Sequence, residues 1–374
     1  MREGGYAQTA RLFRDIAARH SIPPKMAAAF GAYAAYHDQA RASEEAYELA
    51  LNAAPSADTL LCRGLSRLRQ GNWREGWIDM ESRLDALRLT PFSQLRGKSS
   101  GRSVERWRVG EPLPSDLLVF PEQGLGDTLQ FARFLPDLVR RGVEVTVVGR
   151  AYLEPAIRSL SPAPRFHRID EPLISRAERW CCLMSLPALL GLERSSDLAR
   201  SAYLFQDVIG SRPARAESGR LAVGFAWQGN PDHPRDAHRS TRLSALAPLL
   251  RAPGVQPVSL QIGPGASQIA ETPEAERMLT PLGDDASLVD TAKVIADLDL
   301  VISVDTAVAH LAGAMGRRTI LLLAAAGVDW RWRRNQRRTP WYENMAVAQQ
   351  SRAGRWADPV SEALAQVADM GARA

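Results

Sequence analysis

The chain has 374 residues, of which 45% are hydrophobic, so it is long enough to bury two or three compact cores rather than one. Its formal net charge is +5, but 44 of its 47 basic residues are Arg spread along the chain, which indicates a compositional bias rather than a polyanion-binding surface. No apolar run reaches the length of a membrane span, and the first residues lack the apolar core of a signal peptide. We therefore expect a cytoplasmic protein that does not span a membrane.

Residues 1–88 show no strand pattern and predict helices with a repeat of about 34 residues. Gly31 and Gly64 recur at a spacing of 33, and Pro55 stands where a tetratricopeptide unit ends. We predict about two and a half degenerate tetratricopeptide-like repeats. Two roles remain open: a helical cap that packs on the rest of the chain, or a groove that binds a protein partner.

Residues 89–115 are rich in Pro, Gly, Ser and Arg and are predicted to be a linker. Strand, turn and helix patterns then alternate, which is typical of parallel βαβ units. A polar segment at 211–219 divides these units, so we expect an α/β protein with two doubly wound, Rossmann-like domains at 116–210 and 219–374. The apolar runs that predict strands are 117–120, 143–148, 221–227, 258–260, 300–303 and 319–323.

The first candidate site directly follows the first predicted strand, where parallel sheets bind ligands. Its sequence is Glu122-Gln123-Gly124-Leu125-Gly126-Asp127-Thr128. The two glycines would let the backbone approach a ligand, and Asp127 would either face a cleft or cap the following helix. The motif lacks the third glycine of a dinucleotide fingerprint and the Lys of a P-loop, which argues against NAD binding and ATP hydrolysis.

The second candidate site is formed by Asp305, Thr306 and Ala307, which follow another strand and open a helix that contains His310. A helix start carries unpaired N–H groups and partial positive charge, and both favour phosphate. Asp305 would either bind a sugar hydroxyl or cap the helix. His310 is either a substrate contact or a core histidine.

The third candidate site is the polar loop 227–240. Arg235 and Arg239 would bind a pyrophosphate, Arg239 bidentately. The loop also contains two histidines and two aspartates, but the neighbouring arginines argue against a divalent cation. The Asp297 and Asp299 pair lies in a predicted helix-to-strand turn, which disfavours a metal-dependent donor site. We therefore predict no metal site.

The remaining polar and cysteine features predict no further partner. The densest basic run, 331–338, is not accompanied by a nucleic-acid-binding motif, so no nucleic-acid partner is predicted. Cys62, Cys181 and Cys182 have no C-x-x-C spacing, and the adjacent pair does not bridge easily, so we expect reduced, structural thiols.

Residues 107–356 resemble the glycosyltransferase part of bacterial tetratricopeptide-repeat proteins related to ADP-heptose:lipopolysaccharide heptosyltransferases. The residues 71–77, with Glu81 and Arg83, are similar to the last repeat before that part. The segments that carry the resemblance are Trp107 with Glu111-Pro112-Leu113, residues 122–133, Gly229-Asn230-Pro231 with His233, Asp236, Arg239 and Ser240, Ser259-Leu260-Gln261, residues 305–313, residues 329–332, and Pro340-Trp341-Tyr342.

This resemblance implies a GT-B fold, with an acceptor-binding first domain, a nucleotide-sugar-binding second domain and a cleft between them. It implies that Asp127 is a catalytic base, that Asp305 contacts the sugar, and that Thr306 and its neighbouring amides bind pyrophosphate. Arg239 stands where such enzymes often place a phosphate-binding Lys. The expected donor-site residues are Trp227, Gln228, Asn230, Arg239, Asp305, Thr306, Ala307 and His310, and the expected acceptor or cleft residues are Glu122, Gln123, Gly124, Gly126 and Thr128.

We expect inverting, metal-independent transfer of a hexose or heptose from a nucleotide diphosphate sugar, with no other cofactor. The acceptor would be a hydroxyl of a glycan, a lipid-linked glycan or a protein side chain. Two other classes remain open: a non-catalytic scaffold built from the repeats and transferase-like domains, and a hydrolase or epimerase of nucleotide sugars.

Overall fold

The computed structural model describes residues 4–89, 104–173, 176–198, 201–208, 219–333 and 336–372. The chain divides into two compact units. The first comprises Met1–Thr90, Pro187–Asp197 and Ala326–Arg334, and the second comprises Pro91–Leu186, Leu198–Ala325 and Asn335–Ala374. No helix in the described ranges is both long enough and apolar enough to cross a lipid bilayer. Residues 90–103 of the predicted linker lie outside the described residues.

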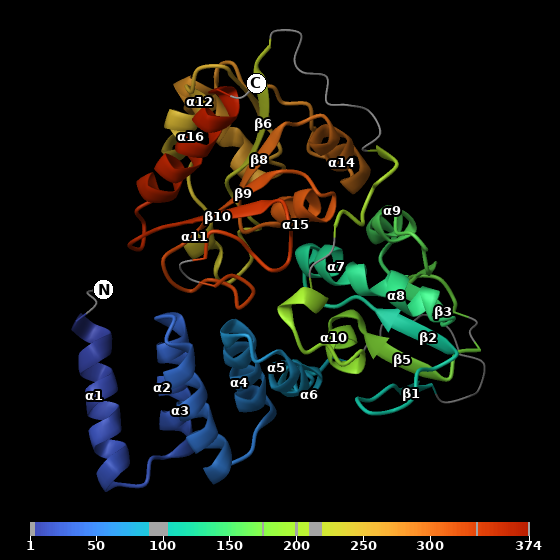
Figure 1. Ribbon diagram of the computed structural model, residues 1–374, viewed down its shortest axis with the longest axis vertical. Coiled ribbons are helices and arrows are strands. Elements are labelled where there is room, and N and C mark those ends of the chain that lie inside the picture. Colours follow the sequence, from blue (N-terminus) through green and yellow to red (C-terminus); the bar gives the residue numbers. More distant parts are fainter. Residues whose placement is uncertain are drawn as a thin grey trace. The chain divides into compact units, whose positions relative to one another are not determined.

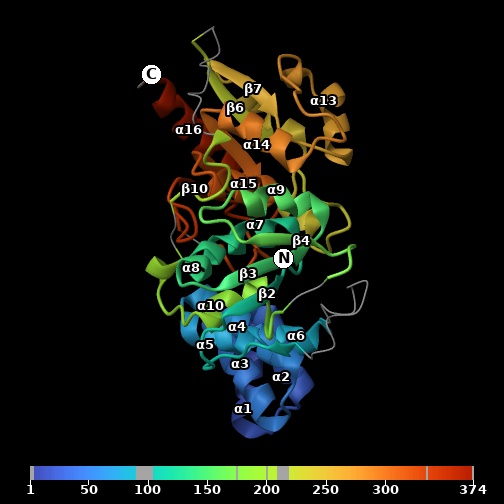
Figure 2. The same ribbon diagram turned by 90° about the vertical axis from the view of Figure 1, so that its right-hand side faces the viewer.

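The first unit is built mainly from helices, shown in blue in Figures 1 and 2. The two glycines that recur in the sequence lie at close helix contacts: a Cβ atom at Gly31 would meet Tyr47 Cε1 at 2.7 Å, and one at Gly64 would meet Asp79 Cβ at 2.9 Å. The repeat spacing therefore marks where helices approach, while its tetratricopeptide character stays a prediction. The helices are α1 (Gly4–Arg19), α2 (Pro24–Tyr36), α3 (Ala40–Ala53), α4 (Ala57–Gln70), α5 (Trp73–Met80) and α6 (Arg83–Ala86), and the unit also takes in most of α10 (Leu186–Leu189) and η5 (Ser195–Asp197).

The second unit contains two five-stranded sheets, each parallel throughout. Figure 2 shows β2, β3 and β4 of the first sheet side by side. The first sheet has the order β1-β5-β2-β3-β4, with β1 (Glu105–Arg106), β2 (Asp116–Phe120), β3 (Glu144–Gly149), β4 (Arg165–Arg168) and β5 (Arg179–Cys182). Its connecting helical turns are α7 (Leu125–Phe131), η2 (Ala132–Phe134), α8 (Leu135–Arg140), η3 (Ala151–Leu153), α9 (Glu154–Arg158) and η4 (Leu183–Ser185).

The second sheet has the order β10-β9-β8-β6-β7, and helices cover both of its faces. Figure 1 shows α12 and α16 on one side and α14 and α15 on the other. Its strands are β6 (Leu221–Ala226), β7 (Val255–Ser259), β8 (Leu300–Val304), β9 (Thr319–Leu323) and β10 (Met345–Gln349). Its helical elements are α11 (Asp236–Arg239), η7 (Leu243–Leu246), α12 (Ala247–Leu250), η8 (Pro264–Ser267), α13 (Gln268–Glu271), η9 (Pro273–Ala275), α14 (Leu288–Ala296), α15 (Ala307–Ala314) and α16 (Ala357–Ala372).

These two sheets confirm the predicted α/β class. In each sheet the chain builds outward in one direction and then returns to the other side of its first long strand, so the strand order reverses beside β2 and beside β6. Open parallel sheets bind ligands at the carboxyl ends of strands at such a reversal. The topology therefore selects the loops after β2 and β5 in the first sheet, and those after β6 and β8 in the second.

Candidate functional site

The loop after β2 is fixed by its own acidic residues. Glu122 accepts a hydrogen bond from the Met184 backbone N–H at 3.2 Å, which ties this loop to the residues that follow β5. Gln123 adopts a left-handed backbone with φ of 64°. Asp127 Oδ2 then accepts from the Gly124 N–H at 2.9 Å and closes a capping arrangement at the start of α7. Thr128 is buried, and its hydroxyl donates to the Gly124 carbonyl at 3.4 Å.

The start of α7 packs closely against α15 of the second sheet's domain. A Cβ atom at Gly126 would lie 2.8 Å from His310 Cδ2, so only a glycine fits without a shift of the ring. This contact brings the residue next to Asp127 against His310. Two of the motifs that the sequence separates by more than 170 residues therefore meet at one point.

The residue at the N-cap of α15 makes no side-chain cap hydrogen bond. Thr306 occupies the N-cap position, but its hydroxyl hydrogen-bonds to the Ser303 hydroxyl at 3.0 Å instead of accepting from the helix. The first N–H groups of the helix, which include that of Ala307, are thus left without a side-chain acceptor from Thr306. Such N–H groups and the helix dipole favour a bound anion. Asp305 lies beside this helix start, and its Oδ1 is 3.9 Å from His310 Nε2.

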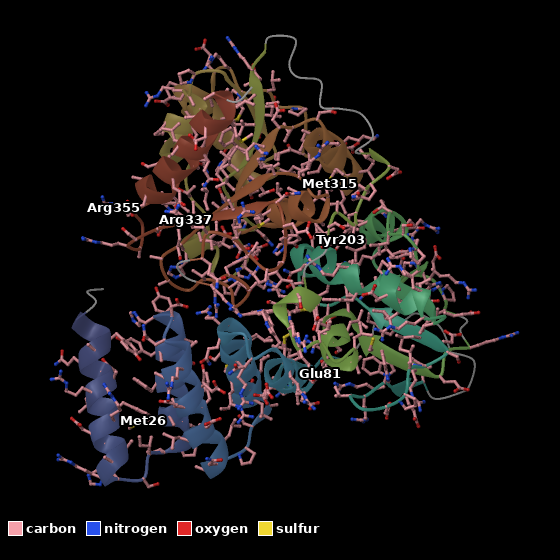
Figure 3. The ribbon with its side chains drawn as sticks, viewed as in Figure 1. Met26, Glu81, Tyr203, Met315, Arg337 and Arg355 are labelled. Carbon is pink, nitrogen blue, oxygen red and sulfur yellow. The ribbon has the colours of Figure 1, made fainter. Side chains whose placement is uncertain are left out.

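His310 is held from its other side by a tyrosine. Its Nδ1 forms a 2.8 Å hydrogen bond with the Tyr342 hydroxyl, and the ring is buried. Tyr342 also hydrogen-bonds to Tyr203, whose hydroxyl donates to the Leu129 carbonyl at 3.0 Å. Figure 3 labels Tyr203 close to α7 and α15. Burial raises the pKa of the Tyr203 hydroxyl, while the nearby Arg133 guanidinium acts in the opposite direction.

Arg133 completes this buried network and is only 2% exposed. Its guanidinium donates to the Leu198 carbonyl at 2.7 Å, to the Trp341 carbonyl at 2.6 Å and to the Tyr203 hydroxyl at 3.0 Å. It also lies over the rings of Tyr203, Trp341 and Tyr342, at 4.7–5.5 Å from their centroids. Arg133 therefore joins the first sheet's domain, the segment between the domains and the second sheet's domain.

The loop after β6 carries a second chain of hydrogen bonds. The Gly229 N–H donates to the Ser240 hydroxyl, which donates to Asp236 Oδ1, both at 2.9 Å. Arg239 Nε donates to the same oxygen at 3.1 Å. Among the residues that the structure describes, the two terminal NH groups of Arg239 donate to no protein acceptor. They are the pair of donors that a phosphate would accept from.

Glutamine amides support this loop from behind. Gln261 accepts from the backbone N–H groups of Trp227 and Gln228, and its own amide donates to the Gln228 carbonyl at 3.0 Å. Gln228 Oε1 accepts from Gln268 Nε2 at 3.0 Å. Trp227 is fully buried in the apolar core, and its indole N–H donates to the Gly265 carbonyl. We therefore assign the Trp227 side chain to support of the loop rather than to ligand contact.

Asn230 lies in the loop after β6 and is exposed, and its Oδ1 accepts from the Asp232 N–H at 3.0 Å, which shapes the turn of the loop. Asp299 accepts from the Ala222 N–H at 2.8 Å, at the amino ends of β6 and β8 and so at the opposite edge of the sheet.

Sequence reasoning assigned no role to Arg133, Tyr203, Tyr342, Gln261 or Gln268. Gln261 had a usable signal, because it stands two residues after the end of β7. Tyr203 had none, since it lies in a segment without periodic pattern and is identified only by its contacts.

One family model and several known proteins match parts of this chain. Residues 257–349 match the family model described as glycosyltransferase family 9 (heptosyltransferase). Protein FlbA of Caulobacter vibrioides (strain ATCC 19089 / CIP 103742 / CB 15) is 26% identical over 337 residues, which cover 82% of this chain and 54% of that protein. The chain thus spans about half the length of that curated relative.

Solved structures that match this chain include E. coli ADP-heptose lps heptosyltransferase II, at 12% identity and a TM-score of 0.49, covering 69% of this chain and 99% of that chain. E. coli heptosyltransferase WaaC with ADP has 15% identity and a TM-score of 0.49, covering 68% and 99%. A Thermobaculum terrenum O-GlcNAc transferase mutant has 13% identity and a TM-score of 0.31, covering 98% and 82%.

The matched residues 257–349 include Asp305, Thr306, His310 and Tyr342. The part of this chain that contains β8, α15, β9 and β10 therefore carries the sequence signature of glycosyltransferase family 9 (heptosyltransferase).

Proposed function

We propose that this protein is a GT-B-type glycosyltransferase that moves a sugar from a nucleoside diphosphate sugar to an acceptor hydroxyl, with inversion and without a metal. One observation carries the proposal. The start of α15, where Thr306 makes no side-chain cap hydrogen bond, lies at the strand-order reversal of the second sheet, and the start of α7, which contains Asp127, packs against α15. This arrangement supports a phosphate site that neighbours a carboxylate.

In the proposed reaction the diphosphate binds the first N–H groups of α15 and the terminal NH groups of Arg239. These groups stabilise the negative charge that develops on the diphosphate as its bond to the sugar breaks. Asp127 accepts the proton of the acceptor hydroxyl, whose oxygen forms the new bond to the sugar.

A thermal-shift experiment tests the donor site. ADP, UDP, GDP, CDP, their sugars and the corresponding monophosphates are each added to the whole protein, and the unfolding temperature is measured. A ligand that binds only the folded protein at about 100 times its Kd adds about 2.7 kcal/mol of stability. We expect at least one diphosphate to raise the unfolding temperature more than its monophosphate does.

If no nucleoside diphosphate or nucleotide sugar raises the unfolding temperature, the proposed donor site is wrong. With a donor identified, mass analysis of candidate acceptors separates transfer from hydrolysis: free sugar without glycosylated acceptor would contradict transfer.

A further inference from the structure

The connection between β9 and β10 leaves the second unit and returns to it. Its flanks belong to the second unit, whereas Ala326–Arg334 belongs to the helical unit. We call residues 326–333, the described part of that segment, the β9–β10 loop. The loop contains Asp329, Trp330, Arg331 and Trp332, a motif for which the proposed reaction provides no role.

Side chains of the last two long helices of the first unit hold this loop. Arg69, in the final turn of α4, donates to the carbonyl oxygens of Val328 and Ala35 and forms an ion pair with Asp38. Trp330 packs edge-on against Trp77 of α5, with ring centroids 5.5 Å apart.

Two further contacts extend the anchor along the loop. The Arg333 guanidinium lies 5.3 Å from the centroid of the Trp73 ring, over its face. Gly327 approaches Tyr36 so closely that an added Cβ atom would lie 3.3 Å from its ring. The loop is therefore held near both of its ends and at its centre by the helical segment.

The residues before and after the loop connect it to elements of the candidate site. Before it, Ala324 and Ala325 follow β9, which pairs with β8 just ahead of Asp305. The amide side chains of Gln349 and Gln350 bind the Ala324 carbonyl and the Ala325 N–H. After it, the chain leads to Tyr342, which holds His310.

We infer that the helical segment orders the β9–β10 loop and thereby sets the affinity of the donor site. This inference rests on the proposed function for its link to donor binding. Arg69 is a positioning residue, because it contacts the loop and not the donor. The residues on either side of the loop connect it to β9 and to Tyr342, and so link the order of the loop to the donor site. Without the contacts of Arg69, the loop would become ordered only when the donor binds. The conformational entropy lost in ordering it would then weaken donor binding.

The test compares Arg69→Ala with Arg63→Ala in the whole protein. Arg63 is a matched control, because it lies in the same helix and makes a two-point ion pair with Asp79, at 2.7 and 2.9 Å, inside the helical segment. Two quantities are measured: hydrogen–deuterium exchange of residues 326–333, and the Kd of whichever of ADP, UDP, GDP and CDP the unmodified protein binds most tightly. Circular dichroism checks that both variants are folded.

We expect Arg69→Ala to speed exchange in the β9–β10 loop while exchange in α7 stays unchanged. If the ordered fraction of the loop falls to about one tenth, the apparent affinity for the diphosphate falls about tenfold. Arg63→Ala should change neither quantity. Trp330→Leu, a change on the loop side, should reproduce the effect of Arg69→Ala.

The inference fails if loop exchange is the same in Arg69→Ala and Arg63→Ala, or if the exchange rises while the affinity is retained. A different result marks failure of the proposed function: the unmodified protein binds none of the four diphosphates. In that case faster exchange in Arg69→Ala still shows that the helical segment orders the loop, and its link to a donor site is refuted.

Discussion

The strand-to-helix turns at the starts of α7 and α15 both contain an Asp-Thr pair, but the hydrogen bonds at the two helix starts differ. At the start of α7, Asp127 turns back and accepts from the Gly124 N–H, so the helix supplies its own negative charge. At the start of α15, the Thr306 hydroxyl bonds to Ser303 instead, and the helix has no side-chain cap. The difference suggests a division of work, in which one turn positions a base and the other receives an anion from outside the chain.

The largest expected effect comes from removing the charge at the first turn. Asp127→Asn keeps the size and the acceptor oxygen that the Gly124 N–H uses, so stability should stay close to that of the unmodified protein. If Asp127 is the general base, turnover should fall by roughly 10²–10⁴-fold with donor affinity nearly unchanged. Steady-state kinetics with the true acceptor measures this. Near-normal turnover would leave Asp127 with a capping role only.

The second turn is tested through Arg239, which we propose binds the same diphosphate. Arg239→Ala removes two terminal NH donors, and a charge-assisted contact is worth about 1.5–3 kcal/mol, so diphosphate affinity should fall about tenfold or more. Arg251→Ala is the matched control, because Arg251 is exposed and pairs with Glu274 at 3.2 Å. Isothermal titration of both variants gives the comparison. Equal affinities would remove Arg239 from the donor site.

The contact between the two turns is tested by adding one methyl group. Gly126→Ala places a Cβ atom 2.8 Å from His310, so α7 and α15 must shift apart, which typically costs about 1–3 kcal/mol of folding stability. In Gly124→Ala the nearest atom is the carboxylate oxygen of Asp127 at 3.2 Å, a longer approach to a side-chain end, so a smaller loss of stability is expected. Denaturant unfolding of both variants decides the point, and an equally stable pair would show that the turns are not in close contact.

The smallest effect on turnover is expected from the Tyr342 hydroxyl, which bonds to His310 of α15. Tyr342→Phe removes the hydroxyl that holds His310 Nδ1, and a hydrogen bond worth about 0.5–1.5 kcal/mol corresponds to about two- to tenfold in turnover. Tyr152→Phe, at an exposed position, serves as the control. If both variants turn over at the same rate, the orientation of His310 does not matter for the reaction.

Most strands of the fold could be predicted from local sequence, because buried parallel strands appear as continuous apolar runs. The runs at 117–120 and 319–323 correspond to β2 and β9. The edge strands β1 and β4 were missed, since Glu105–Arg106 and Arg165–Arg168 are polar and partly exposed and have no such pattern. β5 and β10 were missed as well, because Arg179–Cys182 is short and begins with Arg179, and Met345–Gln349 alternates only weakly.

Some residues of the candidate site could likewise be predicted from local sequence, and others could not. Asp305 was identified because it directly follows an apolar run, and Asp127 because it lies in the turn after one, where the strand position itself is informative. Arg133 and Tyr203 were not identified as parts of one network, because their role depends on contacts across 70 residues of chain. The β9–β10 loop belongs to the helical unit, and no local sequence pattern could have predicted this, because it depends on tertiary contacts.

The buried guanidinium of Arg133 constrains how this architecture can be divided or recombined. Its donors reach the carbonyl oxygens of Gln130, Leu198 and Trp341, and within the described residues it has no carboxylate partner. Without the elements around the second sheet, Arg133 would lose the Trp341 carbonyl and two of the rings that cover it, and a hydrogen bond to a charged group is worth about 1.5–3 kcal/mol. We therefore expect the parts of the chain around the two sheets to unfold together, and an exchange of either part for that of a relative to succeed only where the new part supplies matching carbonyl groups.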